Sequence, residues 1–139
     1  MSEIERLVAL ARQTAGRAYA PYSHFHVGCA VAGPDGLVAV GANMENACYR
    51  LGICAEQAAL AAAQQAFGLD AITHVVIAGG PEGGGTEPVM PCGGCRQAIA
   101  EAASLAGRDI PVTCAGSEGA ARRHTTISEL LPEAFDLPG

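Results

Sequence analysis

The sequence predicts an α/β fold in which one sheet is flanked by helices. Short apolar runs alternate with longer segments of helical periodicity, in the order α-β-β-α-β-α-β-β-α. The chain of 139 residues is long enough for one core and short for two, so we expect a single domain over residues 1–139. Half of the residues are hydrophobic but only 4% are aromatic, which predicts a core of Ala, Val, Leu and Ile.

The N-terminal third predicts a helix followed by a β-hairpin. Ser2 and Glu5 form a capping box, and apolar residues then recur at helical spacing, which predicts a helix over about residues 3–19. After Pro21, the runs FHVGCAVAG and LVAVGAN are separated by the turn sequence Pro34-Asp35-Gly36. Two apolar runs joined in this way predict a hairpin.

The remaining elements follow from helix formers, turn residues and link lengths. A second helix is predicted from Cys54 to Gly68, and a third from near Cys92. The run ITHVVIAG reads as a buried strand, and a Gly/Pro-rich loop follows it. IPVTCAG and ARRHTTI predict two strands, which must be antiparallel because the link between them is too short for a parallel crossover. ISELLPEAF predicts a closing helical turn.

The charge of the chain excludes several kinds of partner. Eight Arg and no Lys stand against 14 acidic residues, a formal charge of -6, and no segment gathers positive charge. Such a surface argues against nucleic acid or an anionic membrane as a partner. No apolar run approaches the roughly 18 residues of a membrane span, and the N-terminus does not resemble a targeting segment. We expect a cytoplasmic protein with a small-molecule substrate.

The six cysteines fall into two groups. Cys29, Cys48 and Cys114 sit in apolar or Ala/Gly-rich surroundings and are expected to be small buried hydrophobic residues. Cys54, Cys92 and Cys95 stand where two helices are predicted to begin. Disulfides are not expected in a chain of this size without a secretion signal.

The second group has the spacing of a catalytic metal site. Two cysteines three positions apart at a helix start can face one ion, and a third thiolate from another helix start leaves the fourth position of a tetrahedral zinc site for water. Helix N-termini also favour the thiolate form. By itself the pair Cys92 and Cys95 fits a redox dithiol equally well. None of the four histidines has ligand spacing, and a structural role is expected for each.

Glu56 favours the catalytic interpretation. A carboxylate two residues from Cys54 would be repelled by the thiolates if it had only a structural role. Placed beside a zinc-bound water, it can carry protons. Cys-x-Glu followed by Pro-Cys-x-x-Cys is a variant of the zinc-deaminase signature.

With these motifs, the chain resembles the small homotetrameric cytidine deaminases over nearly its whole length. The matching blocks are YAPYSHFHVGCA, GANMENACYRLGICAE, PCGGCRQ and ELLPEAF. The resemblance implies a three-layer cytidine-deaminase-like fold with a mixed five-stranded sheet. It also implies one zinc ion per subunit, held by Cys54, Cys92 and Cys95, and hydrolysis of cytidine and 2′-deoxycytidine to the uridines with release of ammonia, as in pyrimidine salvage. Glu56 would be the proton shuttle.

The resemblance also implies roles for residues outside the motif. The implied contacts are Phe25 on the pyrimidine ring, Asn43 and Glu45 at the ribose 3′-hydroxyl, and the Ala55 N–H at O2 of the base. Tyr49 and Phe135 would reach into a neighbouring subunit's pocket, so the homotetramer would complete each site.

Two positions depart from the family pattern. Gln57 replaces an arginine that tempers the negative charge of the thiolates, and Arg50 stands where proline is usual. Arg96 is retained. We hypothesise that Arg50 restores positive potential at the zinc site; alternatively, two helix termini and Arg96 suffice.

Other functions remain to be weighed against cytidine deamination. A deaminase of a modified cytosine nucleoside, such as an aminoacylnucleoside antibiotic, would use the same scaffold with another pocket. A zinc-binding protein without catalysis would not need Glu56. Action on a polynucleotide is opposed by the acidic surface, by the scarcity of aromatic residues for stacking and by the antiparallel final strands.

Overall fold

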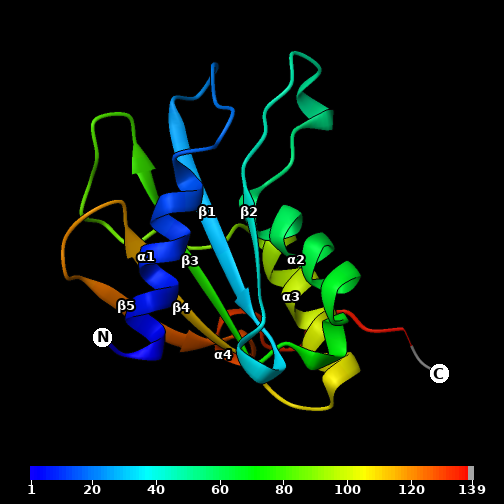
Figure 1. Cartoon of the computed structure of the whole chain (residues 1–139). Helices are drawn as coiled ribbons and strands as arrows, with labels where there is room; N and C mark the ends of the chain where they lie inside the picture. The colour runs from blue at the N-terminus through cyan, green and yellow to red at the C-terminus, as the bar shows by residue number, and fades with distance from the viewer. Residues whose placement is uncertain (138–139) are drawn as a thin grey trace.

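A five-stranded mixed sheet forms the middle layer of the computed structural model, which describes residues 1–137 (Figure 1). The strands lie in the order β2-β1-β3-β4-β5. Their bounds are β1 Phe25–Ala32, β2 Val38–Ala42, β3 His74–Pro81, β4 Pro111–Gly116 and β5 Arg122–Thr126. The α-helices are α1 Glu3–Ala15, α2 Ala55–Ala66, α3 Gly93–Ala106 and α4 Ile127–Leu130, and three short 3-10 turns are η1 Pro34–Gly36, η2 Tyr49–Leu51 and η3 Leu69–Ala71. This confirms the predicted order of helices and strands.

Strand directions follow from the connections. β1 runs antiparallel to both β2 and β3. β3 and β4 are parallel, because α3 carries the chain back across the sheet between them. β4 and β5 are joined by a short turn and are antiparallel, as predicted.

Helices cover both faces of the sheet, which gives three layers. Leu7, Val8 and Ala11 of α1 pack against one face, where they meet Val76 and Ala78 of β3. On the other face, α2 and α3 cover the alternate residues of the same strands, Val75 and Ile77 among them. A strand buried on both faces must be apolar at consecutive positions, which explains the unbroken run that predicted β3.

Helix α1 is shorter than predicted. It ends at Ala15, with Gly16 as its C-cap, and does not continue to residue 19. Beyond it, the backbone of Tyr19 forms a parallel bridge with Met44, and the N–H of Tyr19 donates to the carbonyl of Asn43 at 3.0 Å. This pairing with a segment distant in sequence competes with helix formation, and the glycine makes the break inexpensive.

The predicted starts of α2 and α3 are confirmed. Cys54 is the N-cap of α2 and Cys92 is the N-cap of α3. At the other end of α2, Gly68 has φ 95°, a conformation that favours glycine and stops the helix as expected. In residues 1–137, none of the helices has the length and apolarity needed to cross a membrane.

The cysteines outside the motif differ in burial. Cys29 and Cys114 are buried, as predicted, and burial raises the pKa of Cys114 to about 12. The prediction for Cys48 is wrong, because its side chain is exposed. Cys48 is the N-cap of η2, in the long connection between β2 and α2 that extends away from the sheet (Figure 1).

The strand histidines have structural partners. His74 Nε2 lies 2.9 Å from the hydroxyl of Thr113, and His124 Nδ1 lies 3.1 Å from the same oxygen. The three residues are on neighbouring strands β3, β4 and β5. This agrees with the structural role expected for both histidines.

Two glycines allow the helices to approach the sheet closely. A Cβ atom on Gly28 of β1 would lie 1.9 Å from the carbonyl oxygen of Ala11 in α1. A Cβ atom on Gly41 of β2 would lie 2.4 Å from the backbone nitrogen of Ala59 in α2. Backbone atoms cannot move aside as a side chain can, so these helix positions depend on glycine.

We therefore predict that Gly28→Ala lowers the free energy of unfolding by about 1–3 kcal/mol, because the added methyl group forces α1 away from β1. The midpoint of thermal unfolding should fall by several degrees. Gly93→Ala is the matched control, since a Cβ atom at this first position of α3 meets nothing within 4 Å. Equal unfolding midpoints for the two variants would contradict the packing argument.

Candidate zinc and substrate site

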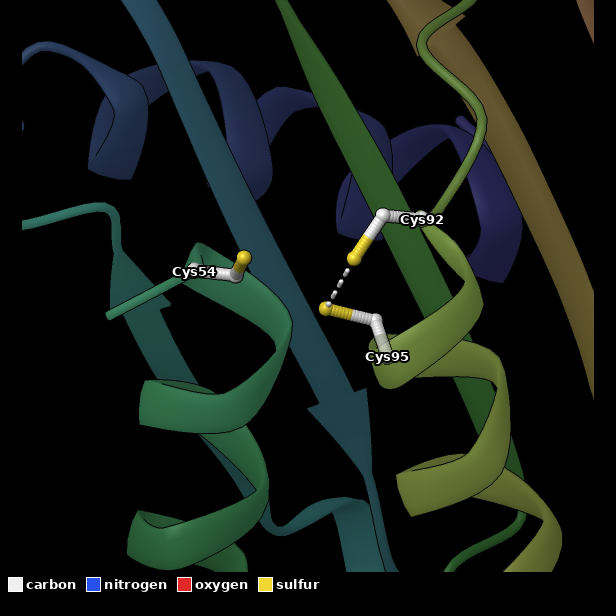
Figure 2. Close-up of side chains that lie close together, drawn as sticks. All are labelled: Cys54, Cys92 and Cys95. Atoms are coloured by element: carbon white, nitrogen blue, oxygen red, sulfur yellow. Dashed lines mark hydrogen bonds between the residues drawn. The ribbon is translucent and has the colours of Figure 1, made fainter. Parts of the chain in front are cut away.

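Three cysteine side chains converge between the starts of α2 and α3. Cys54 and Cys92 are the N-caps of the two helices, and Cys95 lies one turn into α3. Their sulfur atoms all lie within 4.8 Å of one another, and those of Cys92 and Cys95 are 3.5 Å apart. Figure 2 shows the three sulfurs pointing into the space between the two helices.

The geometry and chemistry of these thiols fit zinc. With Zn–S bonds of about 2.3 Å, the sulfurs of a tetrahedral site lie about 3.8 Å apart, close to the spacing seen here. The six cysteines are all free, and a disulfide would need sulfurs about 2.05 Å apart. Within residues 1–137, three soft donors cluster without a fourth, which matches a catalytic zinc site rather than a closed structural one.

The surroundings of the thiols show why a cation is needed. Burial raises the pKa of both Cys54 and Cys95, and the charge of Glu56 raises that of Cys95 further. Cys92 differs, because the backbone N–H of Cys95 lowers its pKa. Two of the three thiols therefore resist ionisation, and a bound divalent cation supplies the missing positive charge.

Glu56 lies beside this cluster on the first turn of α2. It is only 5% exposed, and burial raises its pKa above the ordinary value of a glutamate. A raised pKa makes a carboxylate a stronger proton acceptor, which suits a group that must accept a proton and release it again.

A cavity of about 220 Å³ opens onto Glu56 and the cysteines. Its walls come from four segments: the start of β1, the end of β2, the start of α2 and the loop before α3. The lining residues are Ser23, Phe25, Val27, Asn43, Cys54, Ala55, Glu56, Val89, Met90 and Cys92. The structure thus brings Phe25, Asn43 and Ala55 together with Glu56 and the clustered cysteines. As the first residue of α2, Ala55 has an N–H without a partner inside the helix.

Asn43 and Glu45 make hydrogen bonds that shape the cavity. The Asn43 side chain accepts from Val27 N at 2.9 Å and donates to Phe25 O at 2.9 Å. The Glu45 carboxylate accepts from the backbone of Tyr22 at 3.0 Å and from the hydroxyl of Ser23, whose hydrogen bond lowers the pKa of Glu45. Asn43 therefore holds the start of β1 and Glu45 holds the segment just before it, but Glu45 does not line the cavity.

Tyr49 and Phe135 lie away from the cavity of their own chain. Tyr49 is 80% exposed and packs edge-on against Tyr22, with ring centroids 5.9 Å apart. Phe135 is 69% exposed, and its carbonyl accepts a hydrogen bond from Gln97 at 3.0 Å. Neither aromatic ring contributes to the walls around Glu56.

The residues considered for charge tuning have different surroundings. The Gln57 amide donates to the sulfur of Cys95 at 3.9 Å. The Arg96 guanidinium donates to the carbonyls of Pro91 and Leu130. Arg50 is exposed, and its side chain makes no hydrogen bond or ion pair with any of residues 1–137.

Sequence analysis did not identify Ser23, Val27, Val89 and Met90 as wall residues. Val89 and Met90 directly precede Pro91 and Cys92, so their closeness to the motif was an available signal. Val27 lies two residues after Phe25 in β1, which places both on the same side of the strand, whereas Ser23 lies in the turn before β1 and no alternation could have predicted it.

Comparison with known proteins agrees with this site. Residues 1–106 match the family model described as the cytidine and deoxycytidylate deaminase zinc-binding region. A cytidine deaminase from Halalkalibacterium halodurans is 41% identical over 94% of this chain and 92% of its own length. A cytidine deaminase from Sporosarcina psychrophila is 36% identical over 96% of this chain and 91% of its own length.

Solved structures of cytidine deaminases also superpose on this chain. The crystal structure of cytidine deaminase from Burkholderia pseudomallei superposes with a TM-score of 0.83 at 35% identity, covering 97% of this chain and all of that one. The cytidine deaminase from Mycobacterium tuberculosis superposes with a TM-score of 0.77 at 32% identity, covering 99% and 100%. The cysteine cluster, the matched zinc-binding region and these near full-length relatives show that the chain belongs to the cytidine deaminase family.

Proposed function

We propose that this protein hydrolyses the exocyclic amino group of cytidine and 2′-deoxycytidine, and that Glu56 carries the protons. The observation that carries the proposal is the buried carboxyl group of Glu56, which shares one small cavity with the three clustered cysteines. Cys54, Cys92 and Cys95 would hold one zinc ion. When bound, zinc lowers the pKa of a coordinated water to about 7 and so supplies a nucleophile at neutral pH.

The residues around the cavity have distinct roles in this proposal. Phe25 packs against the pyrimidine ring, and the Ala55 N–H donates to O2 of the base. Glu56 accepts a proton from the attacking water, delivers it to ring N3 and then transfers a proton to the departing ammonia. Asn43 and Glu45 orient the ribose; their hydrogen bonds to residues 22–27 also hold Phe25 in place.

The cavity favours an uncharged nucleoside over a phosphorylated substrate or a polynucleotide. None of the described residues that line it carries positive charge, and the whole chain has a formal charge of -6. A phosphate group would find no cationic partner there. The volume of about 220 Å³ is below the roughly 300–1,000 Å³ of pockets for drug-sized ligands, which suits one base.

We also propose that the active form is a homotetramer with shared sites. The high exposure of Tyr49 and Phe135 supports this, because an exposed aromatic side chain gains contacts when a neighbouring subunit covers it. The cytoplasmic location expected from the sequence remains a prediction.

Glu56→Gln should retain zinc and lose about 10²- to 10⁴-fold in turnover of cytidine, because the amide keeps the shape but cannot shuttle protons. Ultraviolet absorbance at saturating cytidine measures the turnover, and elemental analysis measures the zinc. Glu101→Gln, on an exposed position of α3, should behave like the parent. Substantial residual turnover with zinc bound would remove Glu56 from the mechanism. An inactive parent enzyme with zinc bound would contradict the proposed reaction.

Mixed tetramers test the shared site. Glu56→Gln and Phe135→Ala should each be impaired alone, whereas co-refolded mixtures should regain turnover, because some sites then combine an intact Glu56 with a neighbour's intact Phe135. A mixture of Glu56→Gln with Cys54→Ala should regain no turnover. Each site takes both Cys54 and Glu56 from the same chain, so every site in the mixture lacks one of them. Sedimentation velocity checks the oligomeric state. A monomeric active enzyme would exclude the proposal.

The proposed role of Arg50 is tested by removing its charge. If Arg50 offsets the negative charge of the thiolates, Arg50→Ala should lower turnover and change its pH profile. Arg108→Ala, an exposed arginine just beyond α3, provides the comparison. An unchanged rate and profile for Arg50→Ala would assign the compensation to the helix termini, Gln57 and Arg96.

A further inference from the structure

The side chain of Arg96 joins two parts of the chain that are distant in sequence. Its Nε donates to the carbonyl of Pro91 at 2.8 Å, and its Nη1 donates to the carbonyl of Leu130 at 3.0 Å. Pro91 directly precedes the N-cap Cys92, and Leu130 is the last residue of α4. One guanidinium group therefore connects a cysteine half-site to the C-terminal helix.

Both carbonyl groups need such a donor. Pro91 is fully buried, and a buried carbonyl without a partner is costly. The carbonyl of Leu130 is among those that helix α4 leaves without an internal partner. Arginine can serve both because its rigid planar fork presents several N–H groups in fixed directions, whereas the lysine ammonium is a compact point charge on a flexible stem.

A purely electrostatic role explains the position of Arg96 less well. The helix macrodipole disfavours a cation in the first turn of α3. Among residues 1–137, no carboxylate lies within ion-pair distance of Arg96, and its hydrogen bonds go to backbone carbonyls rather than to a cysteine sulfur.

The bond to Pro91 acts on a proposed metal ligand. The carbonyl of Pro91 and the backbone nitrogen of Cys92 share one planar peptide unit, so holding the oxygen orients the start of Cys92. Cys92 has the extended conformation of an N-cap, with φ -68° and ψ 170°. Arg96 N also donates to Cys92 O at 2.9 Å, so the same residue holds Cys92 from both sides.

Beyond Leu130, the chain continues along α3. Gln97 Nε2 donates to Phe135 O at 3.0 Å, and the Ser104 hydroxyl donates to Asp136 Oδ2 at 3.1 Å. Helix α3 therefore carries two of the three clustered cysteines at its start and the C-terminal segment along its side, and Arg96 lies where the two meet.

We propose that Arg96 is a positioning residue that couples the placement of Cys92 to the docking of residues 127–137 on α3. The proposal rests on the proposed function only in taking Cys92 as a zinc ligand. By linkage, zinc binding and docking of the C-terminal segment stabilise each other to the same extent. The bridge between two carbonyls, and not the positive charge alone, carries this coupling.

Arg96→Lys and Arg96→Gln in the full-length, zinc-loaded protein separate the bridge from the charge. Both variants should release zinc to an excess of a chromogenic chelator about tenfold faster than the parent, the scale expected when a partner of a metal ligand is lost. In both, backbone amides over residues 127–137 should exchange with deuterium faster. Arg108→Lys should match the parent, since the exposed Arg108 side chain makes no hydrogen bond or ion pair in residues 1–137.

Two outcomes would overturn the proposal. Parent-like zinc release and exchange in Arg96→Lys would show that charge suffices, and this variant carries the test if Arg96→Gln does not fold. Faster zinc release with unchanged exchange over 127–137 would show that the two ends are not coupled. Neither readout measures deamination, so an inactive parent enzyme would refute the proposed function and leave this test intact.

Discussion

The packing of α2 and α3 on one face of the sheet, with their first turns side by side, is the constraint on which the site depends. Each helix begins at a cysteine, so the arrangement that buries the core also gathers three sulfurs within 4.8 Å (Figure 2). The close approach of α2 to Gly41 of β2 helps to set the position of the first helix. The placement of the thiols therefore depends on the same contacts that stabilise the fold.

This arrangement places a carboxyl group and thiols in buried positions, where burial disfavours their negatively charged forms. Glu56 is buried among thiols, and burial, followed by the charge of Glu56, raises the pKa of Cys95 and Cys114. Positive potential comes from two helix N-termini and from the Gln57 amide, a neutral donor to Cys95. A divalent cation would balance the rest, which explains why the site suits zinc.

Two segments distant in sequence, around β1 and before α3, wall the cavity, and hydrogen bonds help to hold both in place. Asn43 holds the start of β1 and Glu45 holds the segment before it, and together they keep Phe25 at the cavity wall. The loop before α3 is fastened by Ser117, whose hydroxyl accepts from Gly85 N at 2.7 Å and donates to Gly85 O at 3.1 Å. That loop ends in the wall residues Val89 and Met90. The cavity walls therefore combine the start of β1 and two connecting segments with the first turn of α2, which carries Glu56.

The sequence by itself determined the features that rest on local chemistry. Helical spacing, capping residues and turn glycines predicted the order of elements and the starts of α2 and α3, and the link between β4 and β5 is short enough to decide their antiparallel pairing. The motif predicted a zinc site at Cys54, Cys92 and Cys95 with Glu56 beside it, because Cys-x-Glu followed by Pro-Cys-x-x-Cys is a variant of the zinc-deaminase signature. Tertiary structure decided what depends on distant partners. Helix α1 stops early because Tyr19 pairs with Met44, and Cys48 is exposed because its connection leaves the sheet. The bridge from Arg96 to Pro91 and Leu130 also joins residues that no local pattern relates.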